Sequence, residues 1–280
     1  MTDVATAEQR VTDEGDGPAV VCLHGFPQNA MAFDQVARTL VAGGRRVVRF
    51  DQRGYGDDRL EARRAYTVAR LAEDVLDVVA NHNLAPCVLV GHDLGGLVAW
   101  EVARTDPSIL RGLVIVSVPH PAAFLLSLLG IRQAVSSWYF ALAQSTGLST
   151  AAFSPKREAS RRRLTAQLAK TGLPRAISAP YLEHLTAGDR FAAAIRWYQA
   201  MPLAPPQASF FFVDQCPVEI VWGRDDALTG ELSVNLSRCF VEEDRLRITK
   251  IAGGTHWLLD DSPQVVTEAI ERVLERSTGP

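Results

Sequence analysis

The sequence has few cysteines and no apolar stretch long enough to cross a membrane. The four cysteines, at positions 22, 87, 216 and 239, form no close pairs of the kind that zinc sites use, and we expect no disulfide framework. The most apolar stretch, residues 122–131, is too short to span a bilayer. The N-terminal residues also lack the basic and then apolar arrangement of a signal peptide. We therefore expect a cytoplasmic protein that does not insert into a membrane.

Neither sign of charge dominates the chain. Among 280 residues there are 29 lysines and arginines and 32 aspartates and glutamates, so the formal net charge is only -3. This balance gives no reason to expect nucleic acid as a partner. The hydrophobic fraction of 47% is typical of a globular protein, and the length suits one large domain or a core domain with an insertion. Nothing in the sequence marks a homo-oligomer interface or excludes one.

Short apolar runs alternate with longer helical patterns, which is typical of an α/β protein with a mainly parallel sheet flanked by helices. The predicted buried strands are residues 19–23, 47–50, 87–91, 113–118 and 218–222. Residues 245–251 alternate in polarity, as a strand nearer the edge of the sheet does. Apolar residues at helical spacing predict a helix over 68–79, with Asp74 among the acids that face solvent.

This alternation breaks between His120 and about Phe212, where the patterns are helical and no convincing strand occurs. We interpret residues 121–212 as a helical cap inserted into a core formed by residues 1–120 and 213–280. Such a cap would lie over the carboxyl ends of the strands, where open α/β sheets bind ligands. The basic run KREASRRRL within it is expected to be the solvated face of a helix.

The segment GHDLGG, residues 91–96, joins a predicted strand to a predicted helix. A G-x-X-x-G turn at such a junction strains the backbone at X and needs glycines nearby, and Gly91 and Gly95 meet that need. Asp93 would then project into a cleft, and the N–H of Leu94 would point at whatever reacts with it. Taken alone, GHDLGG also fits a glycine-rich turn with an aspartate as a helix cap.

Two further segments favour a catalytic interpretation. HGFP follows a buried strand and would supply a second oxyanion-hole donor, the N–H of Phe26. GGTHWLLDD places His256 just after the last strand, and WGRDDAL places Asp225 and Asp226 just after the strand before it. The chain order of nucleophile, acid and histidine is the order of an α/β-hydrolase.

With these motifs the chain resembles the α/β-hydrolase superfamily over nearly its whole length, and the loop DQRGYGDD is similar to a loop of the same families. HGFP combined with the aspartate in GHDLGG resembles the epoxide hydrolase and dehalogenase branch. The resemblance implies an α/β-hydrolase fold with an inserted helical cap, and a triad of Asp93 as nucleophile, His256 as base and Asp226 as the acid. Asp226 lies three residues after a glycine, as in the family pattern, and Asp225 is the alternative.

A carboxylate suits the chemistry of that branch. With an ordinary pKa of about 3.9, Asp93 is ionised at neutral pH and needs no base before it attacks carbon. Such an attack opens an activated carbon–heteroatom bond and leaves an alkyl ester on the enzyme. His256 would then activate the water that hydrolyses this ester. The resemblance implies no cofactor and no metal ion.

The residues beside the nucleophile bear on the leaving group. Haloalkane dehalogenases usually carry tryptophan at the position of Leu94, and many carry asparagine at the position of Phe26. Fluoroacetate dehalogenases carry arginines at the positions of Leu94 and Leu97. None of these halide-binding or carboxylate-binding side chains is present.

Epoxide hydrolases instead use two cap tyrosines that donate hydrogen bonds to the epoxide oxygen. SSWYFALAQ and AIRWYQAM resemble the segments that supply them, which assigns these roles to Tyr139 and Tyr198. Taken singly, each tyrosine also fits an aromatic that packs in the cap with its hydroxyl satisfied locally. Trp138, Trp197 and Pro27 are expected to line an apolar substrate pocket.

The sequence therefore predicts an epoxide hydrolase that converts a small hydrophobic epoxide and water to a vicinal diol. One alternative is a haloalkane or haloacid dehalogenase that uses the same triad. Another is a ligand-binding protein of the hydrolase fold that does not turn its ligand over. An esterase is disfavoured because the elbow has no serine.

Overall fold

The computed structural model describes residues 11–56, 60–129, 144, 146–203 and 209–277. One seven-stranded sheet has the order β1-β3-β2-β4-β5-β6-β7. Its strands are β1 (Val11–Glu14), β2 (Ala19–Leu23), β3 (Arg46–Phe50), β4 (Cys87–His92), β5 (Leu110–Val116), β6 (Val218–Gly223) and β7 (Leu246–Ile251). Only the β1–β3 pair is antiparallel; all the other neighbours are parallel. The predicted mainly parallel sheet is confirmed.

All six predicted strands are present, with ends that differ by at most three residues, and β7 is an edge strand as its alternating pattern indicated. The strand that the pattern missed is β1, at the other edge, where only one neighbour supports it. Its residues are half-buried or exposed, so they show no apolar run. The central strands β2 and β4 are buried along their whole length and form the middle of the core.

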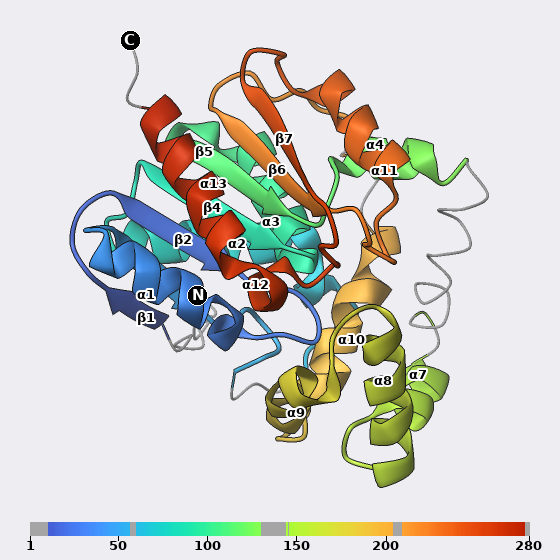
Figure 1. Ribbon diagram of the computed structural model, residues 1–280. Coiled ribbons are helices and arrows are strands. Elements are labelled where there is room, and N and C mark those ends of the chain that lie inside the picture. Colours follow the sequence, from blue (N-terminus) through green and yellow to red (C-terminus); the bar gives the residue numbers. More distant parts are fainter. Residues whose placement is uncertain (1–10, 57–59, 130–143, 145, 204–208, 278–280) are drawn as a thin grey trace.

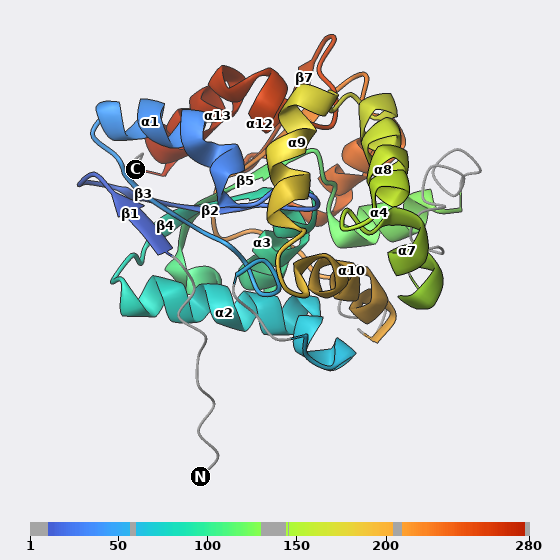
Figure 2. The same cartoon turned by 90° about the horizontal axis from the view of Figure 1, so that it is seen from below.

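Helices cover both faces of the sheet (Figures 1 and 2). On one face, α1 (Asp34–Ala42) and α13 (Pro263–Arg276) contact each other, and α12 (Leu258–Asp261) precedes α13. On the opposite face lie α2 (Val68–Asn81) and α3 (Leu94–Thr105). Alternate residues of β2 serve the two faces: Val20 packs in the cluster that contains α1 and α13, and Val21 in the one that contains α2 and α3.

The helix predicted over 68–79 is α2, but one of its acids lies differently from the prediction. Asp74 is buried and accepts two hydrogen bonds from the guanidinium of Arg53, at 2.6 and 2.7 Å. Helical periodicity places Asp74 beside the polar face, but the loop after β3 crosses that face and carries Arg53 onto it. The prediction that Asp74 faces solvent was therefore wrong.

Between β5 and β6 the described residues form helices and no strand, apart from an isolated bridge at Val213. The helices are α4 (Pro121–Ser127), α7 (Thr146–Phe153), α8 (Glu158–Lys170), α9 (Arg175–His184) and α10 (Arg190–Ala200). The last four group together beyond one end of the sheet, whereas α4 lies beside α11 (Glu231–Leu236) (Figure 1). The division at residues 121 and 212 stays a prediction.

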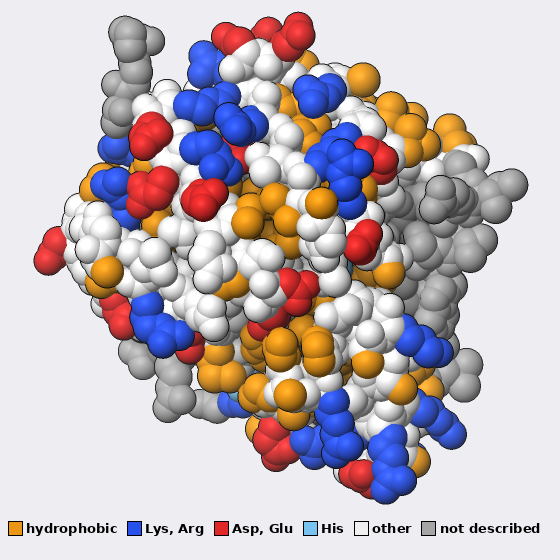
Figure 3. Space-filling view, viewed as in Figure 1, with side chains coloured by type: hydrophobic (Ala, Val, Ile, Leu, Met, Phe, Trp, Pro, Cys, Tyr) orange, Lys and Arg blue, Asp and Glu red, His pale blue; other side chains and the backbone are white. Residues whose placement is uncertain are grey.

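The remaining ordered turns are short 3-10 helices at Ala30–Phe33, Arg63–Tyr66, Pro107–Ile109, Met201–Leu203 and Ser237–Phe240. Helices α7 to α10 are called the cap helices. Lysine and arginine side chains gather on their surface at the bottom of Figure 3. On α8, Arg162 is 77% exposed and bonds Glu158 one turn earlier. None of the helices in the described ranges has the length and apolar character needed to cross a membrane.

Candidate active site

Asp93 lies at the turn between β4 and α3 with a positive φ of 50° and ψ of -123°, a conformation that costs a non-glycine residue free energy. The backbone around it is packed too closely for side chains. A Cβ on Gly91 would lie 2.4 Å from the carbonyl oxygen of Gly95, and one on Gly95 would lie 2.2 Å from that of Leu23. The two glycines therefore allow this turn, which presents Asp93 at the carboxyl end of the central strand.

The loop after β2 holds one oxygen of the Asp93 carboxylate. The N–H of Phe26 donates to Oδ2 of Asp93 at 2.9 Å. Gly25 makes this approach possible, because a Cβ there would lie 2.5 Å from both Cβ and Oδ2 of Asp93. Leu94 begins α3, so its N–H is among the first of the helix, which have no acceptor within the helix.

His256 and Asp226 come together from the loops that follow β7 and β6. Nδ1 of His256 lies 2.9 Å from Oδ2 of Asp226. The other oxygen of Asp226 accepts from the N–H groups of Leu228 and Thr229, at 2.8 and 2.9 Å. This carboxylate is fully buried, whereas Asp225 is exposed. The structure thus brings Asp226, and not Asp225, to the histidine.

The other ring nitrogen of His256 faces Asp93. Nε2 lies 3.7 Å from Oδ1 of Asp93, the carboxylate oxygen that Phe26 does not hold. Burial alone would lower the pKa of His256, but Asp226 and then Asp93 more than offset this and raise it to about 10. The imidazolium and the Phe26 N–H in turn keep the pKa of Asp93 below its ordinary value, against the opposing effect of burial. At neutral pH the pair is an ion pair.

His92, the last residue of β4, connects the two halves of this site. Its Nε2 lies 2.9 Å from the carbonyl oxygen of His256, and the two imidazole rings are 5.1 Å apart. A carbonyl oxygen only accepts, so Nε2 of His92 carries the proton and donates. Burial, and then the charge of His256, lower the pKa of His92 to about 4. His92 therefore stays neutral and ties the loop of His256 to the strand that ends at Asp93.

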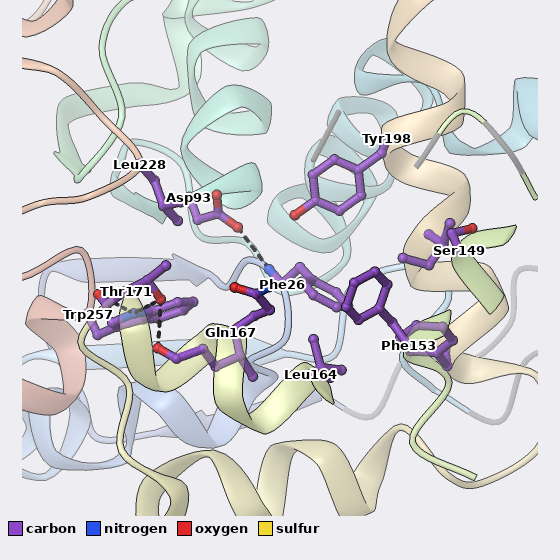
Figure 4. Close-up of a pocket in the computed structure, with 13 residues that line it drawn as sticks. Phe26, Asp93, Ser149, Phe153, Leu164, Gln167, Thr171, Tyr198, Leu228 and Trp257 are labelled. Atoms are coloured by element: carbon purple, nitrogen blue, oxygen red, sulfur yellow. Dashed lines mark hydrogen bonds between the residues drawn. The ribbon is translucent and has the colours of Figure 1, made fainter. Parts of the chain in front are cut away.

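Asp93 opens into a cavity of about 180 Å³ between the sheet and the cap helices (Figure 4). Most of its wall is apolar. The lining residues are Phe26, Asp93, Ser149, Phe153, Leu164, Gln167, Leu168, Thr171, Phe191, Ile195, Tyr198, Leu228 and Trp257. The side chain of Asp93 keeps 16% of its surface accessible. The cavity is suited to an apolar small molecule that presents a reactive carbon to Asp93.

Among the predicted pocket residues, Tyr198 of α10 lines this cavity, and its ring packs edge-on against Phe26 with centroids 5.8 Å apart. Trp197, its neighbour, points elsewhere: its indole N–H donates to the carbonyl of Arg53 at 2.9 Å, and its ring stacks near His24. The α-helical rotation of about 100° per residue explains why the two neighbours diverge. Pro27 is also absent from the lining. Tyr139 and Trp138 lie outside the described residues.

The sequence pattern did not predict that α8 contributes to the cavity wall. Leu164, Gln167, Leu168 and Thr171 follow the i, i+3, i+4, i+7 spacing and form the stripe that faces the cavity, opposite the exposed arginines. The basic run predicts only the solvated face of this helix and carries no signal for the stripe on the other face. Trp257, directly after His256, closes the cavity and donates from its indole to Thr171 at 3.1 Å.

The arrangement combines three chemical capacities. One oxygen of an ionised carboxylate faces an apolar cavity, and the other is held by a backbone donor. An imidazole beside it is oriented by a buried carboxylate that accepts two more backbone hydrogen bonds. Such a set can attack carbon, stabilise an oxyanion and activate water.

These features define the class of protein. The chain belongs to the family described as "alpha/beta hydrolase fold", whose model matches residues 18–263. It is similar to the AB hydrolase superfamily protein YfhM of Bacillus subtilis, with 27% identity over 93% of this chain and 91% of that protein. It is also similar to epoxide hydrolase 4 of Mus musculus, with 27% identity over 93% of this chain and 74% of that protein. An epoxide hydrolase from Bacillus megaterium, solved with an inhibitor, has the same fold, with a TM-score of 0.82. The two sequences are 20% identical, and the match covers 95% of this chain and 96% of that one.

Proposed function

We propose that this protein is an epoxide hydrolase that converts an epoxide and water to a vicinal diol through an ester on Asp93. The observation that carries the proposal is the carboxylate at the elbow, with one oxygen free to face an apolar cavity and the other held by Phe26. An elbow serine would point to acyl transfer, whereas a carboxylate is suited to attack on carbon. Similar proteins named epoxide hydrolases support the same reaction.

The two oxygens of Asp93 have different roles in the first step. Oδ1, which Phe26 leaves free, attacks one carbon of the epoxide, and the bond between that carbon and the ring oxygen breaks. The ring oxygen leaves as an alkoxide and takes a proton from a tyrosine hydroxyl. The position of Tyr198 in the cavity wall supports it as one donor, and Tyr139 is proposed as the second. The product of this step is a β-hydroxyalkyl ester of Asp93.

The second step hydrolyses the ester. Forming the ester removes the negative charge of Asp93, which is one of the two carboxylates that raise the pKa of His256. The pKa therefore falls, and the imidazolium returns a proton to the tyrosinate left by the first step. The neutral imidazole is then available to take a proton from water. Water attacks the carbonyl carbon, the negative charge develops on Oδ2, and the N–H groups of Phe26 and Leu94 stabilise it. Collapse breaks the bond between the carbonyl carbon and Oδ1, and the imidazolium protonates this leaving oxygen, which departs in the diol. The carboxylic acid of Asp93 then gives its proton to the imidazole, which restores the ion pair.

The experiment that tests the proposal is one turnover of styrene oxide by excess enzyme in ¹⁸O-water. Since water attacks the ester carbonyl, the label should appear in the Asp93 carboxyl group, and the first diol should contain none. Mass spectrometry of the peptide that contains Asp93 measures the label. Label in the first diol with none in Asp93 would contradict the covalent route. Release of halide from a haloalkane, without diol from any epoxide, would instead identify a dehalogenase.

Gly25 provides a steric test of the same site. In Gly25→Ala the new Cβ would lie 2.5 Å from Oδ2 of Asp93, so the carboxylate must move. A displacement of about 1 Å costs roughly 10²-fold in rate, and we expect a loss of that size in the rate of ester formation, measured in single turnovers. Gly43→Ala, at an exposed helix end where a Cβ has its closest neighbour at 3.3 Å, is the control. Equal rates for the two variants would contradict the close packing around Asp93.

A further inference from the structure

The polar side chains that face the cavity differ in whether they have partners. Asp93 accepts from Phe26 and lies beside His256. The hydroxyl of Thr171 donates to the carbonyl of Leu168 at 2.8 Å and accepts from the indole of Trp257. Ser149 and Tyr198 also have interaction partners. Among the described lining residues, the side-chain amide of Gln167 is the polar group with no hydrogen bond to the protein.

The position of this amide follows from the pattern of α8. Leu164 and Leu168 flank Gln167 on the stripe that faces the cavity, and both are buried. Figure 4 shows the Gln167 side chain extending from α8 into the cavity, on the side of Phe26 and Asp93. An apolar residue would continue the stripe, whereas the half-buried amide of Gln167 has no hydrogen bond to the protein and is left to water in the cavity. A substrate that displaces this water leaves the amide without a partner unless the substrate itself supplies a hydrogen-bonding atom.

The charge around the cavity limits what that molecule can be. No lysine, arginine or histidine occurs among the described lining residues, and Asp93 is an anion. A substrate with a carboxylate or phosphate group would be repelled by Asp93 and would find no lysine or arginine among the described lining residues to pair with. A neutral oxygen, as in an ether or a carbonyl group, can accept from the amide N–H without either cost.

We infer that Gln167 is a specificity residue that donates a hydrogen bond to a neutral oxygen substituent of the substrate, so that the preferred substrates are oxygen-substituted epoxides rather than purely hydrocarbon ones. This inference rests on the proposed epoxide hydrolysis. The oxirane lies at Asp93, the apolar part of the substrate contacts residues such as Phe153 and Leu164, and the oxygen between them meets Gln167. Removal of the donor then weakens binding of the oxygenated substrate in particular.

The test compares two epoxides that differ in one group. Phenyl glycidyl ether has an ether oxygen where 4-phenyl-1,2-epoxybutane has a methylene. The ratio of their kcat/KM values is measured for the wild-type protein and for Gln167→Met, which keeps the length of the side chain without the amide. We expect kcat/KM for the ether divided by kcat/KM for the hydrocarbon epoxide to be about 3- to 10-fold lower in Gln167→Met than in the wild-type protein. This is the range for the loss of one neutral hydrogen bond. Because the ratio is compared between proteins, the intrinsic reactivities of the two epoxides cancel.

Two further variants make the result specific. Gln167→Glu keeps the shape but replaces the donor with an acceptor, so the ratio should fall at least as far as in Gln167→Met. Gln35→Met, on the exposed side of α1, controls for the general effect of the substitution and should keep the wild-type ratio. An unchanged ratio in both Gln167 variants would overturn the inference. An equal loss for both substrates would also overturn it, since Gln167 would then act on the oxirane or on the cap.

The outcomes separate this inference from the proposed function. If the wild-type protein hydrolyses neither epoxide and forms no ester on Asp93, the proposed function fails and the inference fails with it. If the wild-type protein hydrolyses both epoxides, but the Gln167 variants keep the wild-type ratio or lose activity equally on both substrates, only the role of Gln167 fails. Thermal unfolding of each variant checks that α8 remains folded.

Discussion

Replacing Asp93 with alanine is expected to reduce epoxide turnover by roughly 10⁴-fold or more, because in the proposed mechanism it removes the covalent nucleophile and with it the main reaction path. No other described carboxylate lies in the cavity wall to replace it. The measurement is diol formation from styrene oxide under single-turnover conditions, together with intact-mass spectrometry for an ester adduct. We expect neither diol above the background rate nor any adduct.

A matched variant makes this loss interpretable. Asp225→Ala removes an exposed carboxylate near the partner of His256 and should keep wild-type turnover. Asp93→Ala should also remain folded, since His256 keeps its hydrogen bond to Asp226, and a thermal unfolding experiment checks this. Substantial diol formation by folded Asp93→Ala would mean that water attacks the epoxide directly, and the covalent mechanism would be wrong.

Replacing His256 with glutamine is expected to separate the two half-reactions. An aspartate has an ordinary pKa of about 3.9, and the N–H of Phe26 still donates to the Asp93 carboxylate in the variant, so Asp93 should be ionised at neutral pH and the ester should still form. Its hydrolysis loses the group that activates water, a contribution of typically 10²–10⁴-fold, and steady-state turnover should fall by about that factor. Mixing His256→Gln with styrene oxide and measuring intact mass over time should show the alkyl-enzyme accumulate.

The control for this experiment is His82→Gln, at the end of α2, where the ring pairs with Asp13 instead of facing the cavity. It should show wild-type turnover and no accumulated ester. If His256→Gln forms no adduct at any time or substrate concentration, the histidine also serves the first step. The division of roles between Asp93 and His256 would then need revision.

The core of the fold was predictable from sequence because its signals are local. A strand buried on both faces must be apolar along its length, and β2, β4 and β6 are buried throughout. The edge strand β1 was not predicted, because an edge strand can stay half-exposed and then shows no apolar run. The burial of Asp74 was not predicted for another reason. Its partner, Arg53, lies 21 residues earlier and contacts Asp74 only in the folded chain.

The site was predictable to the extent that short motifs carry it. Asp93, Phe26 and Gly25 meet as the GHDLGG and HGFP motifs predict, because glycines permit backbone approaches that other residues prevent. The cap was less predictable. The neighbours Trp197 and Tyr198 both belong to one aromatic pair in the sequence, yet only Tyr198 faces the cavity. Most residues of α10 are buried, Trp197 and Tyr198 among them, so its sequence pattern does not show which face of the helix lies toward the cavity.

The sequence by itself determined the parallel sheet, the elbow and the chain order of Asp93, Asp226 and His256, because strand burial and tight glycine turns are requirements of the local chain. The family pattern favoured Asp226 with Asp225 as the alternative, and the contact with His256 in the tertiary structure decided between them. The tertiary structure alone placed His92 against the carbonyl of His256 and brought Gln167 to the cavity wall. Each of these depends on contacts between segments far apart in the chain. Such contacts are governed by how elements pack, and the pattern within one element does not contain that information.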